Sequence, residues 1–81
     1  MPGYEFFGEE ERKEVNEVLE TGILMRYGFD GARKGRWKAK ELEEAINKTF
    51  GSKHAQLVCN GTAALTTALA TLGVGYGDEV I

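Results

Sequence analysis

The stretch Leu57-Val58-Cys59-Asn60-Gly61-Thr62-Ala63-Ala64-Leu65 is the most informative part of this sequence for its fold. The partly apolar run 55–59 predicts a short strand, and Asn60-Gly61 predicts a tight turn after it. The small residues that follow the glycine predict the start of a helix. The junction is therefore expected to be a strand that passes through a glycine turn directly into a helix.

This junction has a geometry that suits an anion. The first backbone N–H groups of a helix lack partners, and the helix dipole favours negative charge there. Gly61 and the small Ala63 and Ala64 would let a phosphate approach, and Thr62 offers a hydroxyl. A helix cap by Asn60 or Thr62 is the commoner use of such residues, so both interpretations stay open. The junction contains neither GxGxxG nor the Gly-Lys-Ser/Thr of a P-loop, which argues against dinucleotide and nucleoside triphosphate folds.

Downstream of the junction, the predicted helix 62–72 has threonines as its main polar residues and no strongly charged face. Such a helix is expected to be buried on most sides. The glycine-rich turn 73–78 follows, and 79–81 predicts the start of another strand. Because the other predicted elements are poor cover for this helix, we expect the chain to be a truncated piece of a larger protein.

Upstream, the sequence predicts four segments before the strand. Residues 1–8 combine aromatics with Pro and Gly and predict an extended arm. Residues 9–20 predict a helix with acids in its first turn, where they favour the helix dipole, and Gly22 is a natural stop. Residues 23–37 contain scattered glycines and predict a loop, and 39–50 predicts a second amphipathic helix.

The charge is unevenly distributed although the net charge is only −3. Residues 1–20 carry seven acids and two bases, whereas 21–40 carries six bases and one acid. A solvated surface is the commoner explanation of such a basic region, and a site for a carboxylate or phosphate is the sharper one. Nucleic acid is a weaker choice, because the net charge is negative and the bases form one short run.

Cys59 is the single cysteine, so the chain can form no internal disulfide and no multi-cysteine metal site. We predict no metal site. No stretch approaches the roughly 20 apolar residues of a membrane span, and no signal peptide is evident. These features predict a cytoplasmic protein that does not enter a membrane. A lone histidine such as His54 is more often a packed or surface residue than a catalyst, so we assign it no role.

Four stretches together resemble the sugar aminotransferases of fold-type I, the DegT/DnrJ/EryC1/StrS family. Asn60–Leu65 resembles the family's Ser-Gly-Thr-Ala-Ala-Leu motif, and Leu72–Ile81 resembles the glycine-rich turn and strand that follow it. Pro2–Tyr4 and Phe7–Glu11 are similar to the family's start. The resemblance implies an α/β fold of which this chain is the N-terminal fragment: arm, two helices, first strand, phosphate-facing helix and start of a second strand.

The resemblance also implies a cofactor and a reaction. Gly61, Thr62 and Ala63 would hold the phosphate of pyridoxal 5'-phosphate through backbone N–H groups and the Thr62 hydroxyl. Asn60 stands where the family usually has serine, which puts one phosphate contact in doubt but leaves the backbone donors. The implied enzyme is a homodimer that transfers an amino group from a donor such as glutamate to a keto- or aldehyde-sugar. The catalytic lysine, the acid near the pyridinium nitrogen and the stacking aromatic are expected beyond Ile81.

A narrower resemblance concerns residues 26–40, the basic loop. Arg26–Asp30 and Arg36–Lys38 look like the branch that aminates C8 of an octulosonate for lipopolysaccharide. An acid sugar would explain the bases, and Arg26, Arg33 or Arg36 could pair with its carboxylate because guanidinium suits that geometry.

The domain expectation is that 1–81 forms the N-terminal part of an aminotransferase large domain. Within it, 1–37 comprises the arm, first helix and loop, and 38–81 comprises the second helix, strand and phosphate-facing helix. Two alternatives remain without catalysis. One is a small module that binds an anion at Gly61–Ala63 and forms a stable monomer with no exposed apolar helix. The other is an interaction fragment that binds a partner through its exposed apolar residues.

Overall fold

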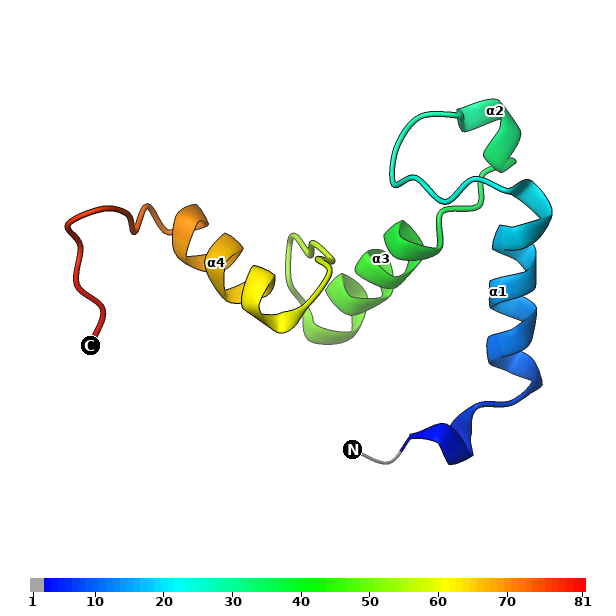
Figure 1. Cartoon of the computed structure of the whole chain (residues 1–81), viewed down its shortest axis with the longest axis horizontal. Helices are drawn as coiled ribbons and strands as arrows, with labels where there is room; N and C mark the ends of the chain where they lie inside the picture. Colours follow the sequence, from blue (N-terminus) through cyan, green and yellow to red (C-terminus); the bar gives the residue numbers. More distant parts are fainter. Residues whose placement is uncertain (1–2) are drawn as a thin grey trace.

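The computed structural model of the protein describes residues 3–81 and is built from helices joined by irregular segments (Figure 1). The elements, in chain order, are a 3-10 turn η1 (Tyr4–Phe6), α1 (Glu9–Thr21), α2 (Asp30–Arg33), α3 (Lys38–Phe50) and α4 (Gly61–Thr71). The helices predicted at 9–20, 39–50 and 62–72 are confirmed, each to within one residue at either end. The arm is partly corrected, because Tyr4–Phe6 forms a turn rather than extended chain. Met1 and Pro2 lie outside the described residues.

Helix α1 is defined by local signals at both ends. At its start, the Glu11 carboxylate accepts the Gly8 N–H at 2.7 Å, and this bond to a backbone donor holds the pKa of Glu11 below its ordinary value. At its end, Gly22 adopts the left-handed conformation, with φ of 68°, and donates its N–H to Val18 O at 3.0 Å. A residue without a Cβ takes that conformation at little cost, which is why the helix stops there.

Helix α3 lies close enough to α1 for ion pairs between them. Lys38, its first residue, donates to Glu14 and to Glu17 of α1. The helix ends at Gly51, which has φ of 68°. Charged residues therefore fix how the two amphipathic helices meet.

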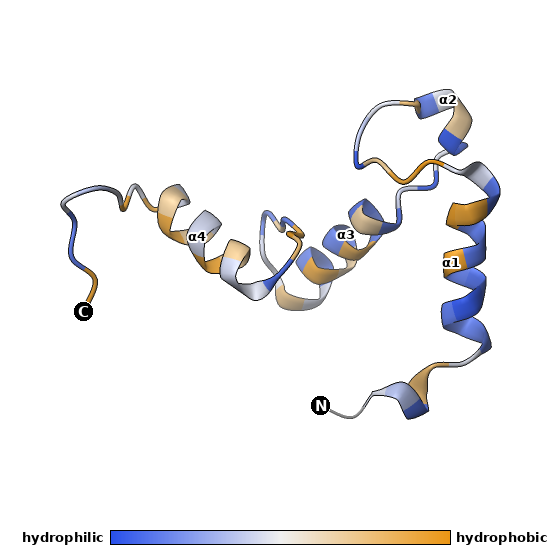
Figure 2. Cartoon of the chain, viewed as in Figure 1, coloured by the Kyte–Doolittle hydropathy of each residue, from blue (hydrophilic) through white to orange (hydrophobic). Residues whose placement is uncertain are grey.

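Helix α4 has no charged residue on any face and only threonines as polar residues, as the sequence predicts. Figure 2 shows orange and pale residues on all of α4, whereas α1 is blue over most of its surface. The predicted burial of this helix is not found within residues 3–81: Leu65 is 70% exposed and Leu72 is 79% exposed. The cover that α4 needs is not supplied by these residues.

The described part of the chain has no hydrophobic core. Its radius of gyration is 16.4 Å, against about 12 Å for a compact chain of this length. Among residues 3–81 no hydrophobic side chain is buried, and the residues that are buried, Arg33 and Glu43, are both charged. Polar contacts rather than apolar packing hold the segments in place.

The predicted strands at 55–59 and 79–81 are not formed, and residues 3–81 contain no strand at all. A strand exists only when its backbone groups bond to a neighbouring strand, and none lies beside either segment. The Leu57 N–H instead donates to the Glu43 carboxylate at 2.7 Å. The α/β architecture expected from the sequence is therefore not present within the described residues. The predicted loop 23–37 also contains the short helix α2.

Candidate functional site

The N-terminus of α4 is the first candidate site, and Asn60 caps it. The Asn60 Oδ1 accepts the Ala63 N–H at 2.7 Å, and the Asn60 carbonyl accepts the Ala64 N–H at 3.0 Å. The capping interpretation of Asn60 is therefore confirmed. Of the three residues that the sequence assigns to an anion, Ala63 already has its backbone donor occupied.

The other donors at this helix end remain available. Within residues 3–81, the Gly61 N–H, the Thr62 N–H and the Thr62 hydroxyl have no hydrogen-bond partner. No atom outside the immediate chain lies within 4 Å of the position that a Cβ on Gly61 would take, so the approach is open. Two backbone donors, one hydroxyl and the positive end of a helix dipole form a donor set that fits a phosphate group.

Glu43 of α3 holds the segment that leads into this helix end. Its Oε1 and Oε2 accept Arg26 Nη2 at 2.6 and 2.7 Å, and its Oε2 also accepts the Leu57 N–H at 2.7 Å. The Arg26 guanidinium and, second, the Leu57 N–H hold the pKa of Glu43 below its ordinary value. One buried carboxylate thus joins the basic loop, α3 and the 55–59 segment.

The role of Glu43 was not anticipated from the sequence, which predicts only an amphipathic helix at 39–50. A weak signal was present. Glu43 follows Ala39 by four positions and precedes Ile46 by three. It therefore lies at the border of the apolar stripe of the helix and not in the middle of the charged face.

Arg33 organises the basic loop from inside. Its Nε donates to Gly28 O at 2.7 Å, and its Nη2 donates to Met25 O and, at 3.4 Å, to Tyr27 O. The guanidinium also lies over the Trp37 ring, 5.0 Å from its centroid. The planar guanidinium can donate to several carbonyls that converge on it. Arg33 is only 4% exposed, so its buried side chain holds the carbonyls of the loop together.

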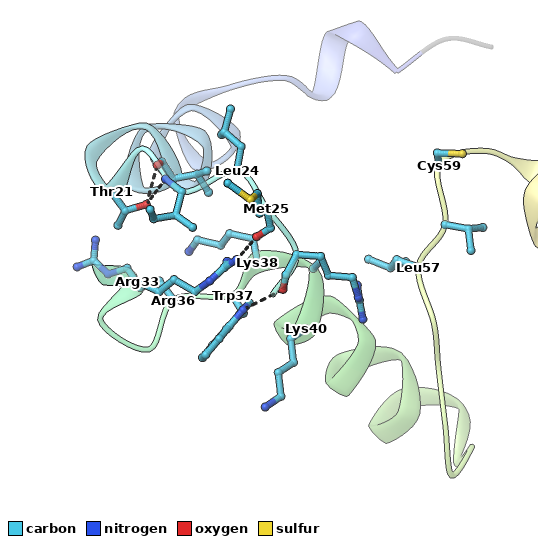
Figure 3. A pocket seen from close by; sticks show the side chains of 15 residues that line it. Thr21, Leu24, Met25, Arg33, Arg36, Trp37, Lys38, Lys40, Leu57 and Cys59 are labelled. Atoms are coloured by element: carbon cyan, nitrogen blue, oxygen red, sulfur yellow. Dashed lines mark hydrogen bonds between the residues drawn. The ribbon is translucent and has the colours of Figure 1, made fainter. Parts of the chain in front are cut away.

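The structure brings the three arginines of the sequence prediction to one pocket of about 400 Å³, on the side of the loop that faces the 55–59 segment. Figure 3 shows Arg33, Arg36, Trp37, Lys38 and Lys40 on one side and Leu57 and Cys59 on the other. Most of the cations are already paired with acids: Arg26 with Glu43, Arg36 with Glu20 at 3.6 Å, and Lys38 with Glu14 and Glu17. Of the two arginines that pair with an acid, Arg36 has the longer distance, 3.6 Å against 2.6 Å for Arg26, and their side chains are similarly exposed, at 44% and 41%.

Comparison with known proteins decides the family. Residues 6–81 match the sequence profile of the DegT/DnrJ/EryC1/StrS aminotransferase family. The chain belongs to this family. The family resemblance carried by Asn60–Leu65 is thereby confirmed, and membership implies the fold-type I architecture for the domain to which such a segment contributes.

Three curated proteins illustrate what this family member is similar to. It is 43% identical over 74 residues to the spore coat polysaccharide biosynthesis protein SpsC of Bacillus subtilis, covering 91% of this chain and 17% of that protein. It is 37% identical over 75 residues to a Streptoalloteichus tenebrarius protein named as an L-glutamine:3-amino-2,3-dideoxy-scyllo-inosose aminotransferase, covering 93% and 17%. It is 35% identical over 81 residues to the 3-amino-5-hydroxybenzoate synthase of Amycolatopsis mediterranei, covering 100% and 19%.

The chain spans less than a fifth of the length of these relatives. Within residues 3–81, no helix has both the length and the apolar character needed to cross a membrane.

Proposed function

We propose that this chain is the N-terminal part of a pyridoxal 5'-phosphate-dependent aminotransferase that acts on a keto- or aldehyde-sugar, with an α/β large domain of which 1–81 is the start. The observation that carries the proposal is the family match over residues 6–81, which includes the glycine junction. The relatives named for polysaccharide biosynthesis and for inosose transamination support a sugar or a similar polyol as the substrate class.

The cofactor phosphate is proposed to bind at Gly61, Thr62 and Ala63. The open N–H groups of Gly61 and Thr62 and the Thr62 hydroxyl supply three donors, and Ala63 adds a fourth when the Asn60 side chain turns away from it. When bound, pyridoxal 5'-phosphate supplies the electron sink for amino transfer. The part played by this chain is to hold the phosphate and so to orient the ring, while the catalytic lysine is proposed to lie beyond Ile81.

For the acceptor, we keep the octulosonate of lipopolysaccharide biosynthesis as the proposed substrate, with a carboxylate that a guanidinium would recognise. Arg36 is the best placed of the three arginines for this contact, because Arg33 is committed to backbone carbonyls and Arg26 to Glu43. Glutamate is the proposed donor, and the relative named for L-glutamine makes that amide the second donor to assay. A cytoplasmic homodimer completes the proposal.

The non-catalytic module is less well supported. Its distinguishing feature would be a chain with no exposed apolar helix, and α4 is exposed along its length in residues 3–81.

The proposal is tested by intact-mass measurement of the purified full-length protein after borohydride reduction, which fixes a bound cofactor covalently to its lysine. We expect a mass increase that corresponds to one pyridoxyl phosphate per chain, and amino transfer from glutamate to an acid sugar before reduction. A full-length protein that remains unmodified after incubation with the cofactor would overturn the proposal.

A further inference from the structure

Glu43 is the buried junction of three segments that are distant in sequence. Arg26 lies 17 residues before it and Leu57 lies 14 residues after it. The carboxylate accepts the guanidinium through both oxygens and the Leu57 N–H through one, and the residue is 6% exposed. The 55–59 segment has no strand partner among residues 3–81, so this bond replaces the ladder hydrogen bond that a strand would have supplied.

The bond at Leu57 lies only a few residues before the start of α4. Only residues 58–60 separate Leu57 from Gly61, and the last of them, Asn60, caps the helix through Ala63 N–H at 2.7 Å. The position of Leu57 limits where Gly61 can lie, because each of the intervening residues spans at most about 3.5 Å. We therefore expect loss of the Leu57 bond to change how the donors of Gly61 and Thr62 are held.

A carboxylate is required for this arrangement. Both of its partners are donors, and an ionised carboxylate offers only acceptors. A glutamine of the same shape keeps one acceptor at the Oε2 position, but its NH₂ group then stands at the Oε1 position and faces the guanidinium donor, and the charge that pairs with Arg26 is lost.

We infer that Glu43 is a positioning residue for the phosphate-binding end of α4, acting through Leu57 and not by touching the cofactor. The inference rests on the proposed function, in which Gly61 and Thr62 hold the cofactor phosphate. The inference predicts that a substitution of Glu43 weakens binding of the cofactor phosphate more than binding of the rest of the cofactor.

The experiment compares pyridoxal 5'-phosphate with pyridoxal, which lacks the phosphate, on the full-length protein. Dissociation constants of both are measured by absorbance titration for the wild type, Glu43→Gln and Glu44→Gln. Glu44 lies next to Glu43 on α3, is exposed, and its side chain forms no hydrogen bond within residues 3–81, so it is a matched control for the loss of one charge. We expect Glu43→Gln to weaken pyridoxal 5'-phosphate about tenfold, the equivalent of one charge-assisted hydrogen bond, and to leave pyridoxal within about twofold.

Glu43→Asp guards against a variant that does not fold. It keeps the charge but is one methylene shorter, so the carboxylate no longer reaches both Arg26 and Leu57, and the same selective loss is expected. Equal weakening of both ligands, or an unchanged ratio in both Glu43 variants, would overturn the inference while the proposed function stands. A wild-type protein that binds neither ligand, or both equally, would overturn the phosphate site and the inference with it.

Discussion

Lys38 Nζ, at the start of α3, lies 2.5 Å from Glu17 Oε2 on α1 and also donates to Glu14 one turn earlier on the same helix. This three-residue clamp joins two helices that bury no apolar side chain between them within residues 3–81. The mutual arrangement of α1 and α3 therefore depends on charge, and conditions that neutralise the clamp should separate them.

The clamp predicts a pH window for stability. The hydrogen bond from Lys38 holds the pKa of Glu17 below 4.5, so the stabilisation is complete above 4.5 and is lost as the pH falls through the lowered value. The carboxylates of Glu14 and Glu17 raise the pKa of Lys38 above 10.5, so the stabilisation is complete below 10.5 and is lost as the pH rises through the raised value.

Lys38→Gln should lower the melting temperature of the full-length protein by the same amount from about pH 6 to pH 9, and the difference should shrink below about pH 4. Lys48→Gln on α3 is the control, because Lys48 forms no salt bridge within residues 3–81 and does not contribute to the pKa shifts of Glu17 and Lys38. If the melting temperatures of the wild type and Lys38→Gln differ by the same amount down to about pH 3, protonation of Glu17 does not release the clamp and the prediction is wrong.

The cap of α4 predicts a local effect. Asn60→Ala removes the acceptor of the Ala63 N–H and should destabilise the helix by about 1 kcal/mol, whereas Asn60→Ser keeps a capping oxygen and should cost much less. Hydrogen exchange of the first turn of α4 in the full-length protein measures the change. Equal exchange in the alanine and serine variants would contradict the cap.

The Thr62 hydroxyl predicts a selective loss of cofactor affinity. Thr62→Ala should weaken pyridoxal 5'-phosphate about tenfold and pyridoxal little, because only the phosphate is placed to use that hydroxyl. Thr66→Ala removes an identical hydroxyl one turn later, where it donates to Thr62 O at 3.0 Å, and should change either affinity less than about twofold. Similar losses in both variants would argue against a phosphate contact at Thr62.

The contacts of the Arg33 side chain predict that the structure of the basic loop depends on this one guanidinium. Arg33→Met leaves carbonyls of Met25, Tyr27 and Gly28 without their donor and should cost about 3 kcal/mol. Arg33→Lys should rescue little, because an ammonium cannot reproduce the fork. The exposed Lys34 provides the control Lys34→Met. Hydrogen exchange across 25–37 should rise in both Arg33 variants and remain unchanged in the control.

Arg36 predicts a contribution to substrate affinity. Arg36→Gln should raise the KM for an acid sugar about tenfold, since a charge-assisted pair is lost, with little change in kcat. The KM for the amino donor is measured in parallel. If Arg36→Gln leaves the KM for a sugar that carries a carboxylate unchanged, Arg36 is not one of the proposed substrate contacts.

The helices could be predicted because their signals are local. Acids in the first turn of α1, glycines at positions 22 and 51, and the repeating apolar residues of α3 each act within a few residues. The motif Asn60–Leu65 was also recognisable because it is contiguous, and the family profile confirms the family that it indicated.

The buried polar contacts could not be predicted because they join distant segments. Nothing near Arg33 in the sequence indicates that three carbonyls would converge on it, and the sequence offered it only as one of three arginines that could pair with a substrate carboxylate. The strand expected at 55–59 is absent for the same kind of reason, because a strand requires a neighbour and residues 3–81 provide none.

The sequence by itself determined the helices, their ends, the apolar character of α4 and the family, because capping, periodicity and a contiguous motif depend on short stretches of chain. Only the tertiary structure decided which charges are used internally. It commits Arg33 to carbonyls and joins Arg26 to Leu57 through Glu43, and it leaves Arg36 with the longer ion pair, to Glu20 at 3.6 Å. The physical reason is that a buried charge must find partners wherever the folded chain brings them, and sequence spacing does not reveal those partners.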